Sequence, residues 1–194
     1  MIIAVIPARG GSKRIPRKNI KNFHGKPIIA YSIEAAINSG CFDKVVVSTD
    51  DLEIAEIAKK NGAVVPYIRP SNISDDYTGT NAVVSHAIQW FCEQGETVEY
   101  ACCIYATAPF LSPKYILEGF KNIQKGEINF SFSVTTFAFP VQRSLRIKDN
   151  CVEPIWSDFI LKRSQDLEEA YHDAGQFYWG TSKAFINKYE MFSC

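Results

Sequence analysis

The sequence lacks the features that mark membrane-spanning, nucleic-acid-binding and cysteine-based proteins. No apolar run approaches the roughly 18 residues that a membrane-spanning helix needs. The 194 residues carry 21 basic and 21 acidic side chains, so no overall charge favours a nucleic-acid partner. The six cysteines show no Cys-x-x-Cys spacing, which argues against a cysteine metal site and a disulfide framework. We therefore expect a protein of the reducing cytoplasm with neither a membrane nor a nucleic-acid partner.

Two common nucleotide-binding motifs are also missing. A P-loop requires Gly-Lys followed by Ser or Thr, but the one Gly-Lys pair, Gly25-Lys26, precedes Pro27. No Gly-x-Gly-x-x-Gly sequence follows the first apolar run, so a dinucleotide fingerprint is absent. A nucleotide site in this chain must use another kind of loop.

The most informative segment is the N-terminal one. Residues 2–6 (Ile-Ile-Ala-Val-Ile) read as a buried strand of a parallel sheet, and they are too few for a signal-peptide core. The run breaks at Pro7 into a loop in which glycine allows backbone N–H groups to approach phosphate oxygens. The loop also holds five cations that would neutralise phosphate charge: Arg9, Lys13, Arg14, Arg17 and Lys18. The segment predicts a polyphosphate-binding site.

Strand and helix patterns alternate through most of the chain. Helical spacing of apolar residues predicts helices over residues 27–39, 50–61, 81–92 and 112–125, and β-branched runs predict strands over 44–48, 63–67, 100–105 and 129–135. This order predicts one domain, residues 1–194, with three α/β/α layers and a mostly parallel, Rossmann-like sheet. Residues 137–170 lose the alternation and are expected to form an irregular excursion.

The loop sequence carries a family resemblance. Pro7-Ala8-Arg9-Gly10-Gly11-Ser12-Lys13, then Ile15-Pro16 and Lys18-Asn19, resembles the signature of the CMP-sialic acid synthetases, or acylneuraminate cytidylyltransferases. Residues 46–50 and Arg69-Pro70 continue the match. Residues 140–143, 163–166 and 171–180 resemble one branch more closely, the pseudaminic acid cytidylyltransferases. The resemblance implies an enzyme that joins CTP to a nine-carbon keto-acid sugar and releases pyrophosphate.

The resemblance also implies an architecture. It predicts the nucleotide-diphospho-sugar transferase type of fold with an arm, about residues 137–170, that crosses to a second subunit. We therefore expect a homodimer, which fits the apolar content of the arm: Phe137, Phe139, Trp156 and Phe159.

The resemblance assigns roles to the residues that match the family motifs. Lys18, with Asn19 and Arg9, is the expected catalytic group, and Lys18 would stabilise charge that develops at the α-phosphate. The expected nucleotide-binding residues are Ala8, Arg9, Gly10, Gly11, Ser12, Lys13, Lys18, Arg69, Thr80 and Thr107. Arg69 is expected to contact the cytidine moiety, and Thr107 lies in the predicted base-pocket loop.

A keto-acid sugar presents a carboxylate, amides and hydroxyls, so its site needs a cation and several hydrogen-bonding groups. The candidates are Gln142, Arg143, Arg163, His172, Asp173, Gln176 and Tyr178. Asp173 is a candidate acceptor for the proton of the sugar hydroxyl. Part of the Phe177-Tyr178-Trp179 run alternates as a core strand does.

The family resemblance implies Mg²⁺ as cofactor, usually held by an Asp-x-Asp motif. This sequence contains no Asp-x-Asp, and the strand-helix unit that carries the motif would be expected after Cys194. The adjacent pairs Asp50-Asp51 and Asp75-Asp76 read as helix caps or turns. The sequence therefore assigns no metal ligand, although substrate phosphates and water can hold much of a Mg²⁺ ion's coordination shell.

Other functions remain open at this point. The same reaction on N-acetylneuraminic acid, legionaminic acid or Kdo would use the same nucleotide loop. A truncated, catalytically impaired CTP-binding module is the alternative from another class. A generic sugar-1-phosphate nucleotidyltransferase is less favoured, because the loop lacks the longer glycine-rich pattern of those proteins.

Overall fold

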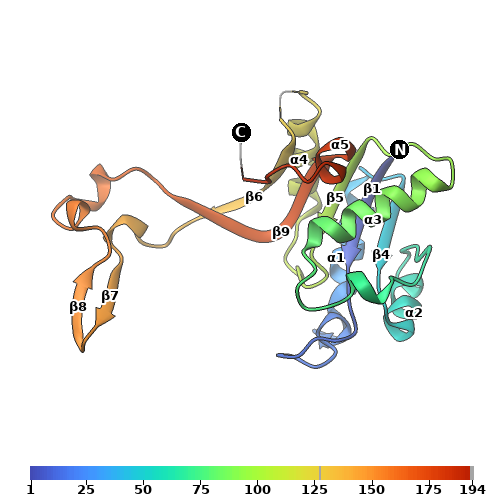
Figure 1. The fold of residues 1–194 in the computed structure, drawn as a ribbon, viewed down its shortest axis with the longest axis horizontal. Helices are drawn as coiled ribbons and strands as arrows, with labels where there is room; N and C mark the ends of the chain where they lie inside the picture. The colour runs from blue at the N-terminus through green and yellow to red at the C-terminus, as the bar shows by residue number, and fades with distance from the viewer. Residues whose placement is uncertain (127, 193–194) are drawn as a thin grey trace. The chain divides into compact units, whose positions relative to one another are not determined.

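A computed structural model describes residues 1–126 and 128–192, so the Cys194 that ends the sequence lies outside the described residues. The chain forms two compact units (Figure 1). One comprises residues 1–133 and the C-terminal segment from Gly175, and the other is Val134–Ala174. The segment predicted as an arm falls within the second unit.

The main sheet has five strands in the order β4-β1-β5-β9-β6. Their bounds are β1 Ile2–Pro7, β4 Lys44–Ser48, β5 Tyr100–Ile104, β6 Phe130–Thr136 and β9 Tyr171–Thr181. The apolar β1 lies between β4 and β5 and pairs parallel with both, whereas β9 pairs antiparallel with β5. The predicted mostly parallel sheet is confirmed, and its carboxyl edge is set by β1, β4 and β5.

Helices cover both faces of this sheet. Ile29 and Ile33 of α1 (Ile28–Ser39) pack in one core cluster with residues of α2 (Leu52–Lys60) and α4 (Pro113–Ile123). Val84 and Ile88 of α3 (Thr80–Glu93) pack in the other cluster with α5 (Ser182–Ile186). In Figure 1, α3 lies in front of the sheet and α1 behind it. The three predicted layers are confirmed.

Local sequence signals fix the helix ends near the site. Asp51 caps α2, because its side chain accepts a hydrogen bond from the Ile54 N–H. Gly40 ends α1 in the left-handed conformation, with φ of 65°, which glycine adopts without strain. Gly119 allows α4 to approach the sheet closely, since a Cβ there would lie 2.7 Å from the Phe177 ring.

The strand predicted over residues 63–67 is wrong. Only isolated bridges form there, Val46 with Val64 and Thr49 with Ile68. Pro66 between them has no N–H to donate to a ladder, so the segment follows β4 without becoming a strand. The structure adds a short hairpin of β2 (Asn22–Phe23) with β3 (Lys26–Pro27), and the 3-10 turns η1 (Lys18–Ile20) and η2 (Ser71–Ile73).

The second unit is more regular than its sequence predicts. β7 (Leu145–Lys148) and β8 (Cys151–Pro154) form an antiparallel hairpin. Its turn residues Asp149 and Asn150 have φ of 50° and 61°, as a two-residue type I′ turn requires. The remaining elements are the 3-10 turns η3 (Val141–Arg143), η4 (Ser157–Phe159) and η5 (Ser164–Asp166).

The cysteines of the described chain are free thiols. Cys102 and Cys103 are fully buried in β5, and burial raises the pKa of the Cys103 thiol to about 12. Within residues 1–126 and 128–192, no helix has the length and apolar character that crossing a membrane requires.

Candidate functional site

The parallel pairing of β1 with β4 places two loops side by side. Pro7 at the end of β1 is in register with Ser48 at the end of β4. The chain continues this pairing into the loop, where the Ala8 N–H donates to the Ser48 carbonyl at 2.9 Å. The Gly10 N–H then donates to the Asp50 carboxylate at 2.9 Å. The glycine loop is therefore anchored to the segment after β4.

The C-terminal end of the same loop contacts its N-terminal end. Asn19 is 7% exposed, and its side-chain amide donates to the Arg9 carbonyl at 2.9 Å. Arg17 forms ion pairs with Asp51 and Glu53. Asn19 therefore closes the loop by bonding to the Arg9 backbone.

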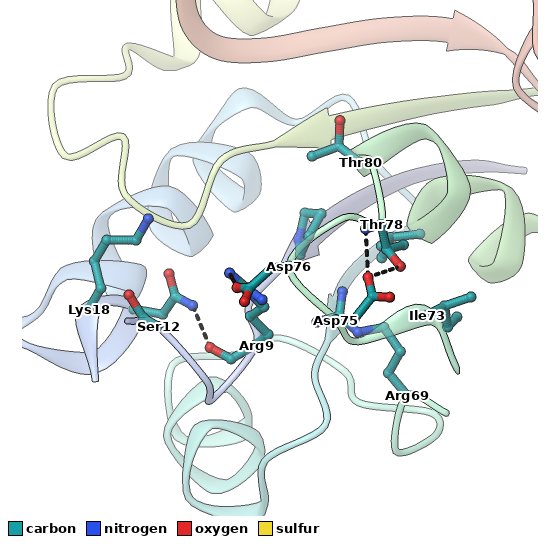
Figure 2. Close-up of a pocket in the computed structure, with 12 residues that line it drawn as sticks. Arg9, Ser12, Lys18, Arg69, Ile73, Asp75, Asp76, Thr78 and Thr80 are labelled. Atoms are coloured by element: carbon teal, nitrogen blue, oxygen red, sulfur yellow. Dashed lines mark hydrogen bonds and ion pairs between the residues drawn. The ribbon is translucent and has the colours of Figure 1, made fainter. Parts of the chain in front are cut away.

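A cavity of about 220 Å³ opens beside this loop. Figure 2 shows Lys18 at one side, Arg69 at the other, and Arg9 with Asp76 between them. The cavity is lined by Pro7, Arg9, Ser12, Lys18, Asn19, Arg69, Ile73, Asp75, Asp76, Thr78, Thr80 and Val83. A neighbouring hollow of about 500 Å³ shares Arg9, Ser12, Lys18 and Asp76 and adds Lys13, Arg14 and Ile15. The two form a basic depression suited to a polyanion.

Asp76 forms ion pairs with both Arg9 and Lys13. The bonds from Lys13 and Arg9 hold the pKa of the Asp76 carboxyl below its usual range. This carboxylate shows that the two cations converge on one oxyanion position. The turn predicted at Asp75-Asp76 is confirmed at Asp75, which accepts from the N–H groups of Tyr77 and Thr78. The ion pairs of Asp76 with the loop cations are an addition that the sequence reading did not include.

Arg69 enters the cavity from the segment after β4. Its backbone N–H donates to the Thr49 carbonyl at 2.7 Å, and its Nε donates to the Ser74 hydroxyl at 3.2 Å. The residue is 5% exposed. Burial lowers the pKa of the guanidinium, and the negative charge of Asp50 partly offsets this. Arg69 is thus a desolvated, fixed cation on the cavity wall, where it would pair strongly with an anion or a base carbonyl.

The first turn of α3 forms another wall of the cavity. Thr80 and Val83 of its first turn line the cavity. Thr80 therefore adds a hydroxyl at the N-terminal end of a 14-residue helix, where the helix dipole favours negative charge.

The structure sorts the predicted nucleotide residues. Five of the ten line the cavity together, Arg9, Ser12, Lys18, Arg69 and Thr80, and Lys13 lines the neighbouring hollow. Ala8 is fully buried, and the N–H groups of Ala8 and Gly10 are bonded to Ser48 and Asp50. The Gly10 N–H is therefore used to anchor the loop within the protein.

The remaining two predicted nucleotide-binding residues, Gly11 and Thr107, lie in different environments. Gly11 is exposed in the loop, with open space where a Cβ would lie. Thr107, half-buried after β5, is absent from the linings of both hollows. Sequence reasoning missed Asp76, Asp50 and Asp51 as partners of the loop. The excess of cations signals that acids must balance them, but only the fold shows which acids do so.

Most predicted sugar-binding residues belong to the second unit. Gln142 donates to the Glu168 carbonyl at 2.8 Å, and Arg143 donates to the Ser164 hydroxyl at 3.1 Å. Arg163 pairs with Asp166 at 2.6 Å. The His172 ring packs on Phe137 with centroids 4.8 Å apart, next to Asp173. These residues form local bonds within the unit.

Gln176 and Tyr178 lie in the first unit on β9. The Gln176 carbonyl accepts from the Tyr105 N–H at 2.9 Å. Tyr178 is 3% exposed and packs between Tyr105 and Phe132, so its ring is part of the core.

The described residues contain no group of three or more His, Cys, Asp or Glu side chains arranged to hold a metal ion. The acids that line the cavity are Asp75 and Asp76. Two carboxylates at one cavity fit a Mg²⁺ ion that takes its other ligands from a bound polyanion and water.

Comparison with known proteins identifies what this arrangement is similar to. A family model described as cytidylyltransferase matches residues 3–188. The pseudaminic acid cytidylyltransferase of Campylobacter jejuni subsp. jejuni serotype O:2 is 48% identical over 187 residues, covering 96% of this chain and 81% of that protein. The CMP-N,N'-diacetyllegionaminic acid synthase of Legionella pneumophila subsp. pneumophila is 32% identical over 195 residues, covering 99% of this chain and 83% of that protein.

A solved structure has the same fold. It is that of CMP:2-keto-3-deoxy-manno-octonic acid synthetase complexed with CTP, with a TM-score of 0.71, 17% identity, and coverage of 96% of this chain and 76% of that chain. The predicted nucleotide-diphospho-sugar transferase type of fold is confirmed. The family model and the two relatives confirm the resemblance carried by the loop at residues 7–19, and the chain belongs to the cytidylyltransferase family.

Proposed function

We propose that this enzyme joins CTP to pseudaminic acid, giving CMP-pseudaminic acid and pyrophosphate. The observation that carries the proposal is the cavity where Arg9, Ser12, Lys18 and Arg69 meet, because it offers fixed cations to a nucleoside triphosphate. The choice of sugar is supported by the 48% identity to a pseudaminic acid cytidylyltransferase. A cytoplasmic location is part of the proposal, supported by the free thiols.

In the proposed reaction, a sugar hydroxyl oxygen attacks the α-phosphorus of CTP. The bond from that phosphorus to the bridging oxygen of the β-phosphate breaks, and pyrophosphate leaves with its electron pair. Arg9 and Lys13 hold phosphate oxygens at the position that Asp76 occupies in the free protein. Lys18 stabilises the charge that develops at the α-phosphate. Arg69 and Thr80 face the cytidine moiety, and Asp173 accepts the hydroxyl proton.

Mg²⁺ is the proposed cofactor. When bound, it neutralises phosphate charge and orients the triphosphate for attack. Asp75 and Asp76 are the cavity carboxylates that could contribute a ligand.

Sugar recognition is assigned to Gln142, Arg143, Arg163, His172 and Gln176. Tyr178, also predicted, is buried in the core of the first unit. A homodimer in which the second unit meets a neighbouring subunit is also proposed. It is supported by the exposed apolar side chains of that unit, such as Phe139 at 60% and Trp156 at 44% exposure.

Two other functions are tested against this proposal. One is the same transfer to N-acetylneuraminic or legionaminic acid, favoured by the similarity to a legionaminic acid synthase. The other is a CTP-binding module without turnover, for which the cation-lined cavity alone would suffice.

The first prediction concerns turnover. We expect pyrophosphate release from CTP and Mg²⁺ with pseudaminic acid, and release at least about tenfold slower with N-acetylneuraminic acid, because sugar contacts discriminate stereoisomers. A coupled phosphate assay measures both rates. Faster release with the second sugar would reassign the substrate. CTP binding by calorimetry without release from either sugar would favour the binding module.

The second prediction concerns Lys18. Lys18→Ala should reduce kcat about 100- to 1,000-fold, because a preorganised cation at the α-phosphate is lost, while the melting temperature stays unchanged. Lys21→Ala, an exposed lysine just after η1, is the matched control and should keep wild-type turnover. Turnover of Lys18→Ala within threefold of wild type would refute the catalytic role.

The third prediction concerns Asp76. Asp76→Asn should tighten the binding of CTP measured without Mg²⁺ roughly threefold to tenfold, because a carboxylate that competes with phosphate for Arg9 and Lys13 is removed. The lowered pKa keeps Asp76 ionised at neutral pH, so its competition persists there. Glu56→Gln on α2 removes an equal charge outside the cavity and should change binding little. Weaker binding by Asp76→Asn alone would show that the carboxylate supports the nucleotide.

The fourth prediction concerns assembly. Light scattering at micromolar concentration should give twice the mass of one chain, because exposed apolar patches favour association. Trp156→Asp should shift the mass toward one chain, whereas Lys148→Asp on the neighbouring hairpin should not. A monomeric mass for the wild-type protein would exclude the homodimer.

A further inference from the structure

Arg17 is the residue immediately before Lys18, and it lines neither the cavity nor the neighbouring hollow. We propose that Arg17 is a positioning residue that fixes Lys18 toward the nucleotide through a clamp with Asp51. The inference rests on the proposed function, because it concerns how Lys18 is held for that reaction.

The clamp consists of a two-point ion pair. The two terminal nitrogens of Arg17 donate to the two oxygens of the Asp51 carboxylate, Nη2 to Oδ1 at 3.0 Å, and Arg17 also pairs with Glu53. The geometry restricts the guanidinium in two directions, which a single contact would not do. In agreement, bonding to Asp51 raises the pKa of Arg17, and bonding to Arg17 lowers the pKa of Asp51.

Asp51 is itself fixed, so it can serve as an anchor. Its Oδ1 accepts from the Ile54 N–H at 3.0 Å as the cap of α2, and its own N–H donates to the Thr49 hydroxyl at 3.1 Å. Gly10 packs against the same carboxylate, since a Cβ on Gly10 would lie 2.5 Å from Oδ2. One carboxylate therefore contacts both the start and the end of the phosphate loop.

The backbone of Arg17 explains why a clamp is needed. Its φ of 54° and ψ of 32° are left-handed, a conformation that is unfavourable for a residue other than glycine. The turn that follows depends on it, because the Ile20 N–H donates to the Arg17 carbonyl at 3.0 Å and places Lys18 and Asn19 in η1. Strained backbone persists where surrounding contacts over-determine it. Here those contacts are the bonds to Asp51 and Glu53.

Loss of the clamp should affect the chemical step more than nucleotide binding. Arg9, Ser12 and Arg69 line the cavity independently of Arg17 and would still hold CTP. Lys18 would lose its fixed direction, and a misplacement of about 1 Å at a reacting centre costs on the order of 100-fold in rate.

The test is a kinetic double-mutant cycle. Arg17→Ala should reduce kcat about tenfold to 100-fold, with KM for CTP within threefold of wild type. Asp51→Ser should do the same, because serine still caps α2 but is too short to hold the guanidinium. The double variant should be no slower than the slower single variant, since both remove one interaction. Additive losses, or a loss confined to KM, would overturn the clamp.

Three controls separate the clamp from other effects. Arg17→Gly relieves the left-handed strain without restoring the ion pair, so it should be as slow as Arg17→Ala; wild-type turnover would show that only strain mattered. Arg17→Lys should recover part of kcat through a one-point bond to Asp51. Lys59→Ala breaks a surface pair with Glu56 on the same helix α2 and should leave kcat unchanged.

Amide exchange distinguishes failure of the clamp from failure of the proposed function. The N–H groups of Ile20 and Lys21 are bonded within η1. They should exchange about tenfold faster in Arg17→Ala, whether or not the wild-type protein releases pyrophosphate. An inactive wild-type protein would refute the function alone. Unchanged exchange together with unchanged kcat in an active enzyme would refute the clamp alone.

Discussion

The parallel pairing of β1 with β4 is the constraint on which the site depends. It is made of backbone hydrogen bonds in a fully buried part of the sheet, and it brings Pro7 and Ser48 to the same edge. Because these two strands end side by side, the loop after β1 lies against the segment after β4. Gly10 reaches Asp50, Arg17 reaches Asp51, and Arg69 enters the cavity after bonding to Thr49.

Acidic side chains compensate much of the positive charge of the loop. Three of its cations, Arg9, Lys13 and Arg17, form ion pairs with acids. The ion pair of Arg17 differs from those of Arg9 and Lys13 in how firmly the acid is held. Arg17 pairs with Asp51, which is part of a helix cap and cannot leave without loss of that cap. Arg9 and Lys13 pair with Asp76, which lies in the segment between η2 and α3 and holds a position that phosphate oxygens can take. In the proposed function the Arg17 pair stays in place, whereas the Asp76 pairs give way to phosphate oxygens.

The division of the chain into two units parallels a division of tasks in the proposed function. The first unit holds the cavity assigned to CTP. The second unit holds most of the residues assigned to the sugar. Three of them, Gln142, Arg143 and Arg163, bond to Glu168, Ser164 and Asp166 of the same unit. A conserved reaction with different sugars is easier to reach when the sugar contacts occupy a separate unit, because changes there leave the nucleotide loop intact.

The sequence by itself determined the fold class, the family and the cation-rich loop. These depend on local features, namely apolar periodicity, the break at Pro7 and the motif at residues 7–19, each of which is readable along the chain. It also predicted that Arg9, Ser12, Lys18, Arg69 and Thr80 belong to one site. Only the tertiary structure decided which acids balance the loop, that Gly10 donates to Asp50, that Asn19 is buried, and that Asp76 faces the cations. These are contacts between residues 10 to 70 positions apart, and their partners are set by strand order and register, which no local pattern encodes.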